Sequence, residues 1–406
     1  MTRASLASTP VQAVILAGGL GIRMRPLTDS APKPMIRLHG RPFLEYLVEQ
    51  LRDEGIQQIL LLLGYRPDAV ISHFGDGSRW GVSISYSVTP PEVQTGTRVR
   101  EALDAIDPVF MLLYCDNYWP MQLDRMWRRF VEADPAGMAT IYRNKDGYSR
   151  DNVRVVDGRI EDYDRTRTRA GLGGVEIGYA ILKRDIVVDL LGPEDVAIEE
   201  AVYPALADRG ALLAYETDHR YYGIGSLERL PATTEFLARR PTILLDRDGV
   251  LNRRPPRAEY IRHPDEFVWL PGALEALRLL TDAGYRLLVI SNQAGVARGA
   301  MTEADLMAVE DRMLADARDA GGRIDGAYYC RHDWNAGCDC RKPLPGMLFQ
   351  AQRDHALDLT RTPYIGDDDR DGEAAELAGA PFIQVTDERS LLTIARSMIP
   401  EVSLTP

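Results

Sequence analysis

Residues 244–252 read LLDRDGVLN, an apolar pair followed by two aspartates, a glycine and a second apolar pair. In an extended segment the side chains of residues i and i+2 lie on one face, so Asp246 and Asp248 can converge on one phosphoryl group and one cation. A D-x-D turn alone is often a solvated loop. The chemistry of this segment therefore depends on what the rest of the chain brings beside it.

Three further polar clusters follow later in the chain. They are a Ser-Asn-Gln triplet after the apolar run 285–290, an Arg-Lys-Pro triplet, and the acidic segment 366–371 (GDDDRD) after the run 362–365. Polar groups at the carboxyl ends of parallel strands share one crevice in an open sheet. We therefore predict one phosphate pocket, with Asp246 and Asp248 as its catalytic residues. Its predicted substrate- and phosphate-binding residues are Ser291, Asn292, Gln293, Arg341 and Lys342.

These four clusters, in this order, resemble the haloacid dehalogenase-like phosphatases over roughly residues 241–390. The resemblance implies that Asp246 attacks phosphorus to form an aspartyl phosphate, while Asp248 protonates the leaving oxygen and later activates water. It also implies a Mg²⁺ ion held by Asp246, by the backbone carbonyl of Asp248 and by Asp367. The expected substrate of this half is a phosphate monoester.

Four metal-ligand side chains occur within residues 330–340: Cys330, His332, Cys338 and Cys340. Three thiolates and one imidazole suit tetrahedral Zn²⁺, and four protein ligands leave no open position for water. We therefore expect a structural zinc that fixes the loop before the Arg-Lys-Pro triplet; a reactive dithiol is the less favoured alternative. With Cys115 standing alone, the cysteines form no disulfide framework, which favours a reducing compartment, the cytoplasm.

Within that superfamily, the zinc loop followed by CRKP resembles both the heptose 1,7-bisphosphate 7-phosphatases and the histidinol-phosphate phosphatases. The five-residue spacing inside the loop is similar to the second group. The longer stretches, above all SNQAGVARG (291–299), are similar to the first group and favour it. One departure is Asp368, which stands where the heptose enzymes usually have a substrate-contacting lysine. An acid there is expected to repel a phosphate.

A second phosphate-binding pattern lies near the N-terminus, where residues 16–34 read LAGGLGIRMRPLTDSAPKP. Glycines let backbone N–H groups approach phosphate oxygens, and Arg23 and Lys33 can neutralise their charge. A strand, GGxGxR and a later PKP resemble the sugar-1-phosphate nucleotidyltransferases over roughly residues 11–230. Within that family, residues 42–77 are similar to the heptose- and mannose-1-phosphate guanylyltransferase branch.

The resemblance implies condensation of a nucleoside triphosphate, GTP, with a sugar 1-phosphate, and it implies a catalytic metal on Asp116. The implied nucleotide-binding residues are Gly18, Gly19, Gly21, Arg23, Lys33, Thr95 and Gly96. The family's second metal-binding aspartate is replaced by Gly223, and Asp218 is a less favoured substitute. The usual sugar-phosphate lysine has no clean counterpart, although Arg165 or Arg167 can be considered for that role.

The order of apolar runs and amphipathic stretches predicts two doubly wound α/β domains. Residues 1–237 are expected to form a Rossmann-like nucleotidyltransferase fold, and residues 238–406 a haloacid dehalogenase-like fold with a zinc-bound loop. The net charge of −12 opposes binding to nucleic acid or to an anionic membrane. No apolar run approaches the roughly 20 residues that span a bilayer. We therefore expect neither nucleic acid nor membrane as a partner.

Together the two resemblances predict a bifunctional enzyme. The C-terminal half would remove the 7-phosphate of D-glycero-D-manno-heptose 1,7-bisphosphate, and the N-terminal half would convert the 1-phosphate into a nucleotide sugar, GDP-heptose. Two alternatives stay open. In one, the N-terminal half is a noncatalytic nucleotide-sugar-binding module; in the other, the phosphatase acts on histidinol phosphate, which would leave the N-terminal half without a related task.

Overall fold

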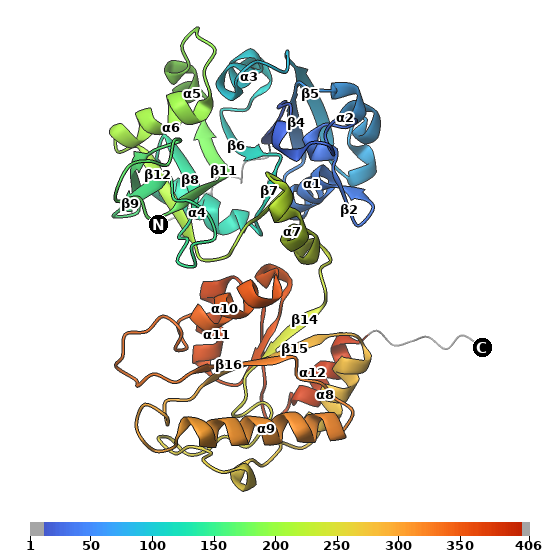
Figure 1. Ribbon diagram of the computed structural model, residues 1–406, viewed down its shortest axis with the longest axis vertical. Coiled ribbons are helices and arrows are strands. Elements are labelled where there is room, and N and C mark those ends of the chain that lie inside the picture. The colour runs from blue at the N-terminus through green and yellow to red at the C-terminus, as the bar shows by residue number, and fades with distance from the viewer. Residues whose placement is uncertain (1–11, 400–406) are drawn as a thin grey trace, which may run out of the picture. The chain divides into compact units, whose positions relative to one another are not determined.

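The computed structural model describes residues 12–399, and the chain divides into two compact units, Met1–Leu237 and Ala238–Pro406 (Figure 1). Along residues 12–399 no helix combines the length and the apolar character needed to cross a bilayer. Each unit builds its own sheet and its own core.

Within residues 12–237 the first unit forms a nine-stranded mixed sheet, ordered β5-β4-β1-β6-β11-β8-β12-β10-β9. The first four strands of this order are mutually parallel, and β11 then pairs antiparallel with both β6 and β8. The strands are β1 (Gln12–Ala17), β4 (Gln58–Leu63), β5 (Ser83–Val88), β6 (Val109–Tyr114), β8 (Gly137–Tyr142), β9 (Val153–Val156), β10 (Arg159–Tyr163), β11 (Val175–Lys183) and β12 (Leu212–Thr217). Two small ribbons pair β2 (Arg37–Leu38) with β3 (Arg41–Pro42), and β7 (Asn117–Tyr118) with β13 (Tyr222–Gly223).

The helices of the first unit follow the strands in α/β order. They are α1 (Phe43–Asp53), α2 (Pro67–Phe74), α3 (Thr95–Glu101), α4 (Leu123–Ala133), α5 (Arg184–Leu190), α6 (Ile198–Asp208) and α7 (Leu230–Leu237). In α1 the apolar side chains recur every three or four residues and are buried, which gives the helix one face against the sheet. Strand β1 is buried at every residue, as expected for a parallel strand covered on both faces.

Within residues 238–399 the second unit forms a five-stranded, fully parallel sheet ordered β16-β15-β14-β17-β18. Its strands are β14 (Thr242–Leu245), β15 (Arg286–Asn292), β16 (Gly326–Cys330), β17 (Tyr364–Gly366) and β18 (Phe382–Gln384). Its helices are α8 (Ala273–Asp282), α9 (Glu303–Asp319), α10 (Gly346–His355), α11 (Asp369–Ala378) and α12 (Leu391–Met398).

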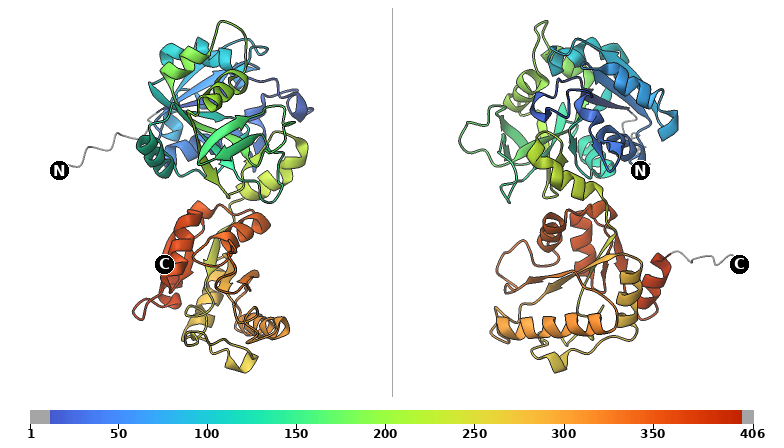
Figure 2. Two further views of the ribbon diagram at one scale, coloured as in Figure 1. Left: turned by 90° about the vertical axis from the view of Figure 1, so that its left-hand side faces the viewer. Right: turned by 45° about the vertical axis from the view of Figure 1, so that its right-hand side comes forward.

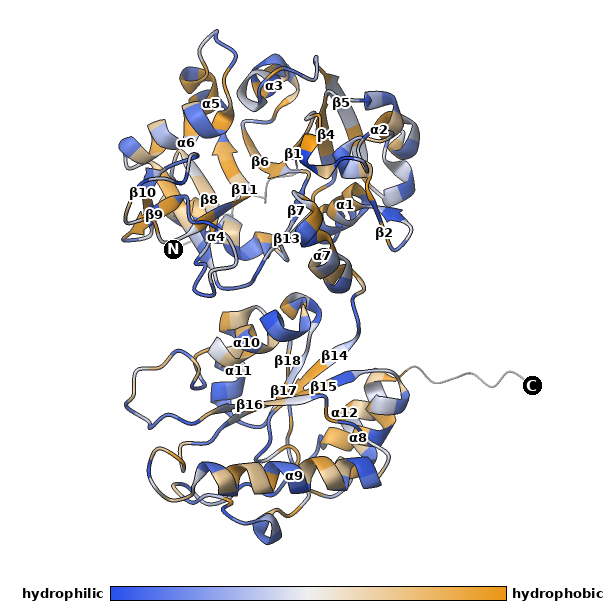
Figure 3. Ribbon diagram, in the orientation of Figure 1, coloured by the Kyte–Doolittle hydropathy of each residue, from blue (hydrophilic) through white to orange (hydrophobic). Residues whose placement is uncertain are grey.

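The faces of this sheet carry separate cores because successive side chains of a strand point in opposite directions. Ile243 and Leu245 pack with residues of α8, α9 and α12, whereas Leu244 packs with residues of α10 and α11. Figure 2 shows these helices on the two sides of the sheet, and Figure 3 shows the apolar colour of β14 between them. The two α/β folds that the sequence predicts are therefore confirmed, with the qualification that the first sheet is mixed.

The chain runs outward from β14 through β15 to β16, and then returns to the other side of β14 for β17 and β18. Such a reversal opens a crevice at the carboxyl ends of the strands beside it. The four polar clusters of the C-terminal half lie at or after the ends of strands β14, β15, β16 and β17, with Ser291 and Asn292 as the last two residues of β15.

Candidate active site

The first polar cluster of the C-terminal unit begins directly after β14. Carboxylate oxygens of Asp246, Asp367 and Asp371 lie within 4.8 Å of one another, although the three residues come from separate segments. Asp367 follows β17, and Asp371 stands in the first turn of α11. The predicted convergence of Asp246 and Asp367 is present, and Asp371 joins them. Its position four residues after Asp367 was the available sequence signal.

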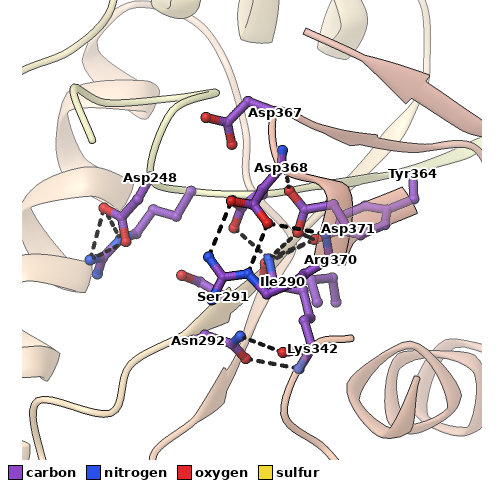
Figure 4. A network of polar contacts seen from close by, with 12 residues as sticks. Asp248, Ile290, Ser291, Asn292, Lys342, Tyr364, Asp367, Asp368, Arg370 and Asp371 are labelled. Carbon is purple, nitrogen blue, oxygen red and sulfur yellow. Dashed lines mark hydrogen bonds and ion pairs between the residues drawn. The ribbon is translucent and has the colours of Figure 1, made fainter. Parts of the chain in front are cut away.

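Lys342 bridges two of these three carboxylates, those of Asp246 and Asp371; Figure 4 labels Lys342 and Asp371. Its Nζ lies 2.8 Å from Asp246 Oδ1 and 2.7 Å from Asp371 Oδ1, and it also donates to the Tyr364 hydroxyl at 2.8 Å. The lysine side chain is only 4% exposed. Burial raises the pKa of Asp246, while the two carboxylates hold the pKa of Lys342 above its ordinary value even though burial opposes its charge.

Asp248 is held separately from this group by three donors. Arg247 Nη2 lies 3.0 Å from Asp248 Oδ2, Asn252 Nδ2 lies 2.9 Å from Oδ1, and Gln293 Nε2 lies 2.9 Å from Oδ2. Although burial opposes it, the Arg247 charge and these hydrogen bonds lower the pKa of Asp248. The carboxylate is thereby fixed in one orientation beside Asp246. Neither Arg247 nor Asn252 was selected from the sequence, although both lie inside the quoted LLDRDGVLN segment.

Two predicted phosphate-binding residues have protein partners instead. Gln293 donates both to Asp248 and to Ser291 Oγ, each at 2.9 Å. Asn292 pairs with the backbone of Lys342, donating to its carbonyl and accepting from its N–H at 3.1 Å each. Their amides thus orient the catalytic acid and the lysine loop. Ser291 and Lys342 line the floor of the pocket, and Arg341 lines it with a buried Nη1 that has no protein partner.

The turn after Asp248 is shaped by Gly249. Its φ of +105° lies in a region that L side chains rarely adopt, and a Cβ there would overlap the Asp367 carboxylate. Asp367 in turn accepts from Arg254 Nη2 at 2.9 Å. Burial raises the pKa of Asp367 to about 6 in spite of this arginine. The glycine therefore lets the D-x-D turn and the end of β17 approach each other closely.

The Cys/His cluster, comprising Cys330, His332, Cys338 and Cys340, is brought together at the end of β16. The Cys330 sulfur lies 3.7 Å from the Cys338 sulfur and 3.7 Å from His332 Nδ1, and His332 Nδ1 lies 3.1 Å from the Cys340 sulfur. Two ligands about 2.3 Å from a tetrahedral zinc lie about 3.8 Å apart. The donor set and the two 3.7 Å spacings fit that metal, whereas the 3.1 Å spacing is shorter than a bound zinc would give. The residue after the cluster is Arg341.

In the N-terminal unit the predicted glycine loop follows β1, and Asp116 follows β6. Lys33 Nζ is 2.5 Å from Asp116 Oδ2, and although burial opposes both charges, the lysine lowers the pKa of Asp116 and the aspartate raises that of Lys33. Gly21 has a φ of +64°, and a side chain at Gly19 would meet open space. The loop that contains Gly19 and Gly21 thus leaves backbone accessible beside the ion pair, with Arg23 exposed in the same loop.

Thr95 and Gly96, two further predicted residues, hold the start of α3 close to the start of α6. Thr95 Oγ1 donates to Glu199 Oε2 at 2.7 Å and accepts from the Ile198 N–H at 3.0 Å. A Cβ at Gly96 would lie 2.5 Å from the Val196 carbonyl, so this position requires glycine for close approach. Both residues therefore shape the segment that the sequence predicts to bind the nucleotide.

The position of the missing second aspartate is beside Asp116. Gly223 pairs with Asn117 between β13 and β7, and a Cβ at Gly223 would lie 2.5 Å from Asn117 Oδ1. Asp218 is paired with Arg143 at 2.9 Å and with Lys145 at 3.4 Å. It is thus committed to basic partners on another segment, which argues against the substitution considered from the sequence.

The two arginines considered for the sugar phosphate are also engaged. Arg165 forms an ion pair with Glu200, and Arg167 donates to the Arg150 carbonyl at 2.6 Å. The structure also places Glu176, which was not selected from the sequence, near Asp116 and Glu199. Its pKa is raised to about 8 by burial, with Glu199 and Asp116 adding to the shift while the Gly178 N–H opposes it.

In comparisons with known proteins, the two units match different protein families. A nucleotidyl transferase family model matches residues 12–151, and a HAD-hydrolase-like model matches residues 339–397. The chain is 40% identical over 160 residues to D-glycero-beta-D-manno-heptose-1,7-bisphosphate 7-phosphatase of Bordetella bronchiseptica, covering 39% of this chain and 88% of that protein. The protein of the same name from Rhodopseudomonas palustris is 39% identical over 155 residues, covering 36% and 84%.

Among solved structures, a putative glucose-1-phosphate thymidylyltransferase from Bacillus anthracis matches 55% of this chain and 93% of its own, at 18% identity and a TM-score of 0.50. That similarity shows the fold of the first unit. The protein is thus a fusion of a nucleotidyltransferase-like unit with a haloacid dehalogenase-like hydrolase. Through its second unit the chain belongs to the D-glycero-beta-D-manno-heptose-1,7-bisphosphate 7-phosphatase family.

Proposed function

We propose that residues 238–406 form a magnesium-dependent phosphatase that removes the 7-phosphate of D-glycero-D-manno-heptose 1,7-bisphosphate. The observation that carries this proposal is the buried group in which Lys342 joins Asp246 and Asp371, with Asp367 beside them. A buried carboxylate beside an ammonium group is placed to attack a phosphoryl group whose oxygens the lysine also holds. The named relatives support the choice of substrate.

In the first step an Asp246 oxygen forms a bond to phosphorus while the bond from phosphorus to the sugar oxygen breaks. Asp248 gives its proton to that leaving oxygen. In the second step a water oxygen attacks the aspartyl phosphate, Asp248 accepts a proton from the water, and Asp246 is released. A phosphate dianion in the pocket raises the pKa of Asp248 by like-charge repulsion, which favours the protonated form needed at the start.

Three carboxylates that meet within 4.8 Å are an oxygen donor set that suits Mg²⁺. Asp246, the backbone carbonyl of Asp248 and Asp367 would hold the ion, with Asp371 adjacent. When bound, Mg²⁺ offsets the negative charge that otherwise keeps a carboxylate and a phosphate apart.

The Cys/His cluster is proposed to hold one structural zinc, supported by its donor set and by its two 3.7 Å spacings. Its role is to fix the loop that carries Arg341 and Lys342 into the pocket. Because the three thiols must stay reduced to bind metal, we place the protein in the cytoplasm.

For residues 1–237 we propose transfer of a guanylyl group from GTP to the heptose 1-phosphate that the second unit produces. The glycine loop beside Lys33 and Asp116 supports phosphate binding, and the sugar phosphate oxygen supplies the nucleophile. A second candidate, a nucleotide-sugar-binding module without transferase activity, is favoured by Gly223, because Asp116 then lacks its usual acidic partner at that position.

Two assays test these proposals. Phosphate release is compared between heptose 1,7-bisphosphate and histidinol phosphate, and we expect the heptose ester to be the better substrate; a preference for histidinol phosphate would refute the substrate assignment.

Asp246→Asn should lower turnover by at least about 10³-fold without unfolding the protein. Pyrophosphate release from GTP, Mg²⁺ and heptose 1-phosphate tests the first unit, and absence of release with any nucleotide favours the binding module.

A further inference from the structure

The pocket of the second unit, about 830 Å³ in volume, is lined by cations at two depths. On its floor the side chains of Lys342 and its partner Asp246 are 4% and 7% exposed. At its mouth the side chains of Arg254 and Arg370 are 41% and 51% exposed. The floor already supplies the charge and donors that one transferring phosphoryl group needs. Arg254 contacts Asp367, but neither outer arginine forms or breaks a bond in the proposed chemical steps.

Asp368 holds these two arginines together. Arg370 donates from Nε to Asp368 Oδ1 at 2.8 Å and from Nη2 to Oδ2 at 3.1 Å, and Arg254 Nη1 donates to Oδ2 at 3.1 Å. Arg254 also pairs with Asp367 at 2.9 Å, so the two arginines balance the charges of two aspartates. The arginines therefore offset the repulsion expected from an acid at position 368.

The carboxylate also restricts the side chains of the arginines. Asp368 caps α11 through its bond to the Arg370 N–H, so the acid itself is fixed to the helix terminus. Each guanidinium has five N–H groups, and Arg370 Nη1 is not used by Asp368. Arginine held in this way is well suited to a phosphate because its planar fork matches two phosphate oxygens.

We propose that Arg254 and Arg370, oriented by Asp368, form a second anion subsite that binds the phosphate at the far end of a bisphosphorylated sugar. This inference rests on the proposed function, because it requires a sugar ester to enter the pocket with its transferred phosphate on the floor. Binding energy supplied away from the reacting centre separates a bisphosphate from the corresponding monophosphate. The subsite thus explains how the pocket selects its substrate class.

The test measures binding without turnover in the full-length, magnesium-loaded Asp246→Asn protein. Calorimetry gives the Kd of D-glycero-D-manno-heptose 1,7-bisphosphate and of D-glycero-D-manno-heptose 7-phosphate, which differ only in the distal phosphate. We expect the bisphosphate to bind about 10- to 100-fold more tightly, as for one or two charge-assisted hydrogen bonds. Adding Arg370→Gln should remove most of that ratio.

The control variants separate this role from others. Arg278→Gln removes an arginine that is likewise paired to an aspartate, at 3.1 Å from Asp282, but lies on α8 outside the pocket, and it should leave the ratio intact. Arg370→Gln is the cleaner of the two subsite variants because Arg254 also contacts Asp367. The Mg²⁺ affinity of Arg370→Gln should match that of its parent. In the otherwise unaltered enzyme, Arg370→Gln should raise KM for the bisphosphate with little change in kcat.

A Kd ratio near one in the parent protein would overturn the subsite, as would an equal loss of both ligands in Arg370→Gln, which would place this arginine on the transferred phosphate. Failure of the otherwise unaltered enzyme to hydrolyse either heptose ester would overturn the proposed function. The binding ratio still decides the subsite in that case.

Discussion

The charged residues at the floor of the second unit's pocket are unusual because they are buried together. Asp246, Asp371 and Lys342 bring two carboxylates against one ammonium group. Buried ion pairs contribute little net stability, because the loss of hydration offsets their attraction. The remaining negative charge suits a divalent cation. The cluster therefore adds little to stability, in keeping with the reaction site that we propose here.

Gly249→Ala tests the close approach between the D-x-D turn and Asp367. The added methyl group would overlap the Asp367 carboxylate, so we expect phosphatase kcat to fall by at least about 100-fold and the Mg²⁺ requirement to rise. Gly284→Ala is the matched control, because Gly284 also has a positive φ, +83°, but its Cβ would meet open space. It should cost only about 1 kcal/mol of stability and keep its activity. Equal activities of the two variants would contradict this account.

Glu176 predicts a pH dependence of stability in the first unit. Its pKa is about 8 in the folded chain against an ordinary value of 4.5, so the native state binds the proton more tightly. This contribution is fully present below pH 4.5 and is lost as pH rises through 8. From pH 6 to pH 9 the free energy of unfolding should fall by about 2–3 kcal/mol, and less in Glu176→Gln. Denaturant unfolding at both pH values measures it; identical pH profiles would exclude the effect.

The sequence pointed more readily to the residues that we propose carry the chemistry than to the residues that contact and orient them. Asp246, Asp248 and Lys342 stand in short motifs whose spacing is visible in the chain. Asp371 contacts Lys342, which only the folded sheet brings near, whereas Arg247 pairs with its own neighbour Asp248; polar side chains in such segments are equally typical of solvated loops. Asn292 was assigned to phosphate, yet its amide holds the Lys342 backbone, since backbone hydrogen bonds leave no local signature.

At the level of elements, the apolar runs identified β14, β15 and β17 together with the crevice at their ends. The mixed character of the first sheet was not predicted. Strands β8, β11 and β12 join it through contacts between segments far apart in the chain. Periodicity reports which residues are buried but not the direction or order of strands. The pairing of β11 with β6, which places Glu176 near Asp116, was therefore not predictable from the sequence.

We predict that the conformation of the loop between β16 and α10 depends on a bound metal. Cys340→Ser should remove about one equivalent of co-purified zinc and raise KM for the sugar phosphate, because the loop positions Arg341 and Lys342. Cys115→Ser is the control, since Cys115 is a buried cysteine of the first unit. Metal analysis that finds no zinc in the parent protein, or unchanged zinc in Cys340→Ser, would refute the Cys/His cluster as a zinc site.

For the whole molecule, each activity should depend on its own unit. Lys33→Met should abolish pyrophosphate release and leave phosphate release unchanged, while Asp246→Asn should do the reverse. Lys183→Met, which removes a lysine paired with Asp134 at 2.6 Å on the surface of the first unit, should affect neither activity. Loss of both activities in either active-site variant would show that the units do not act separately.

The most direct measurement asks where phosphorus is attached during turnover. The enzyme is mixed with heptose 1,7-bisphosphate and Mg²⁺, quenched in acid within one turnover, reduced with borohydride and digested for mass spectrometry. Reduction converts an aspartyl phosphate into homoserine, and we predict homoserine at position 246 alone. Phosphate release without any modified aspartate, or with the modification at another residue, would contradict the assignment of Asp246 as the nucleophile.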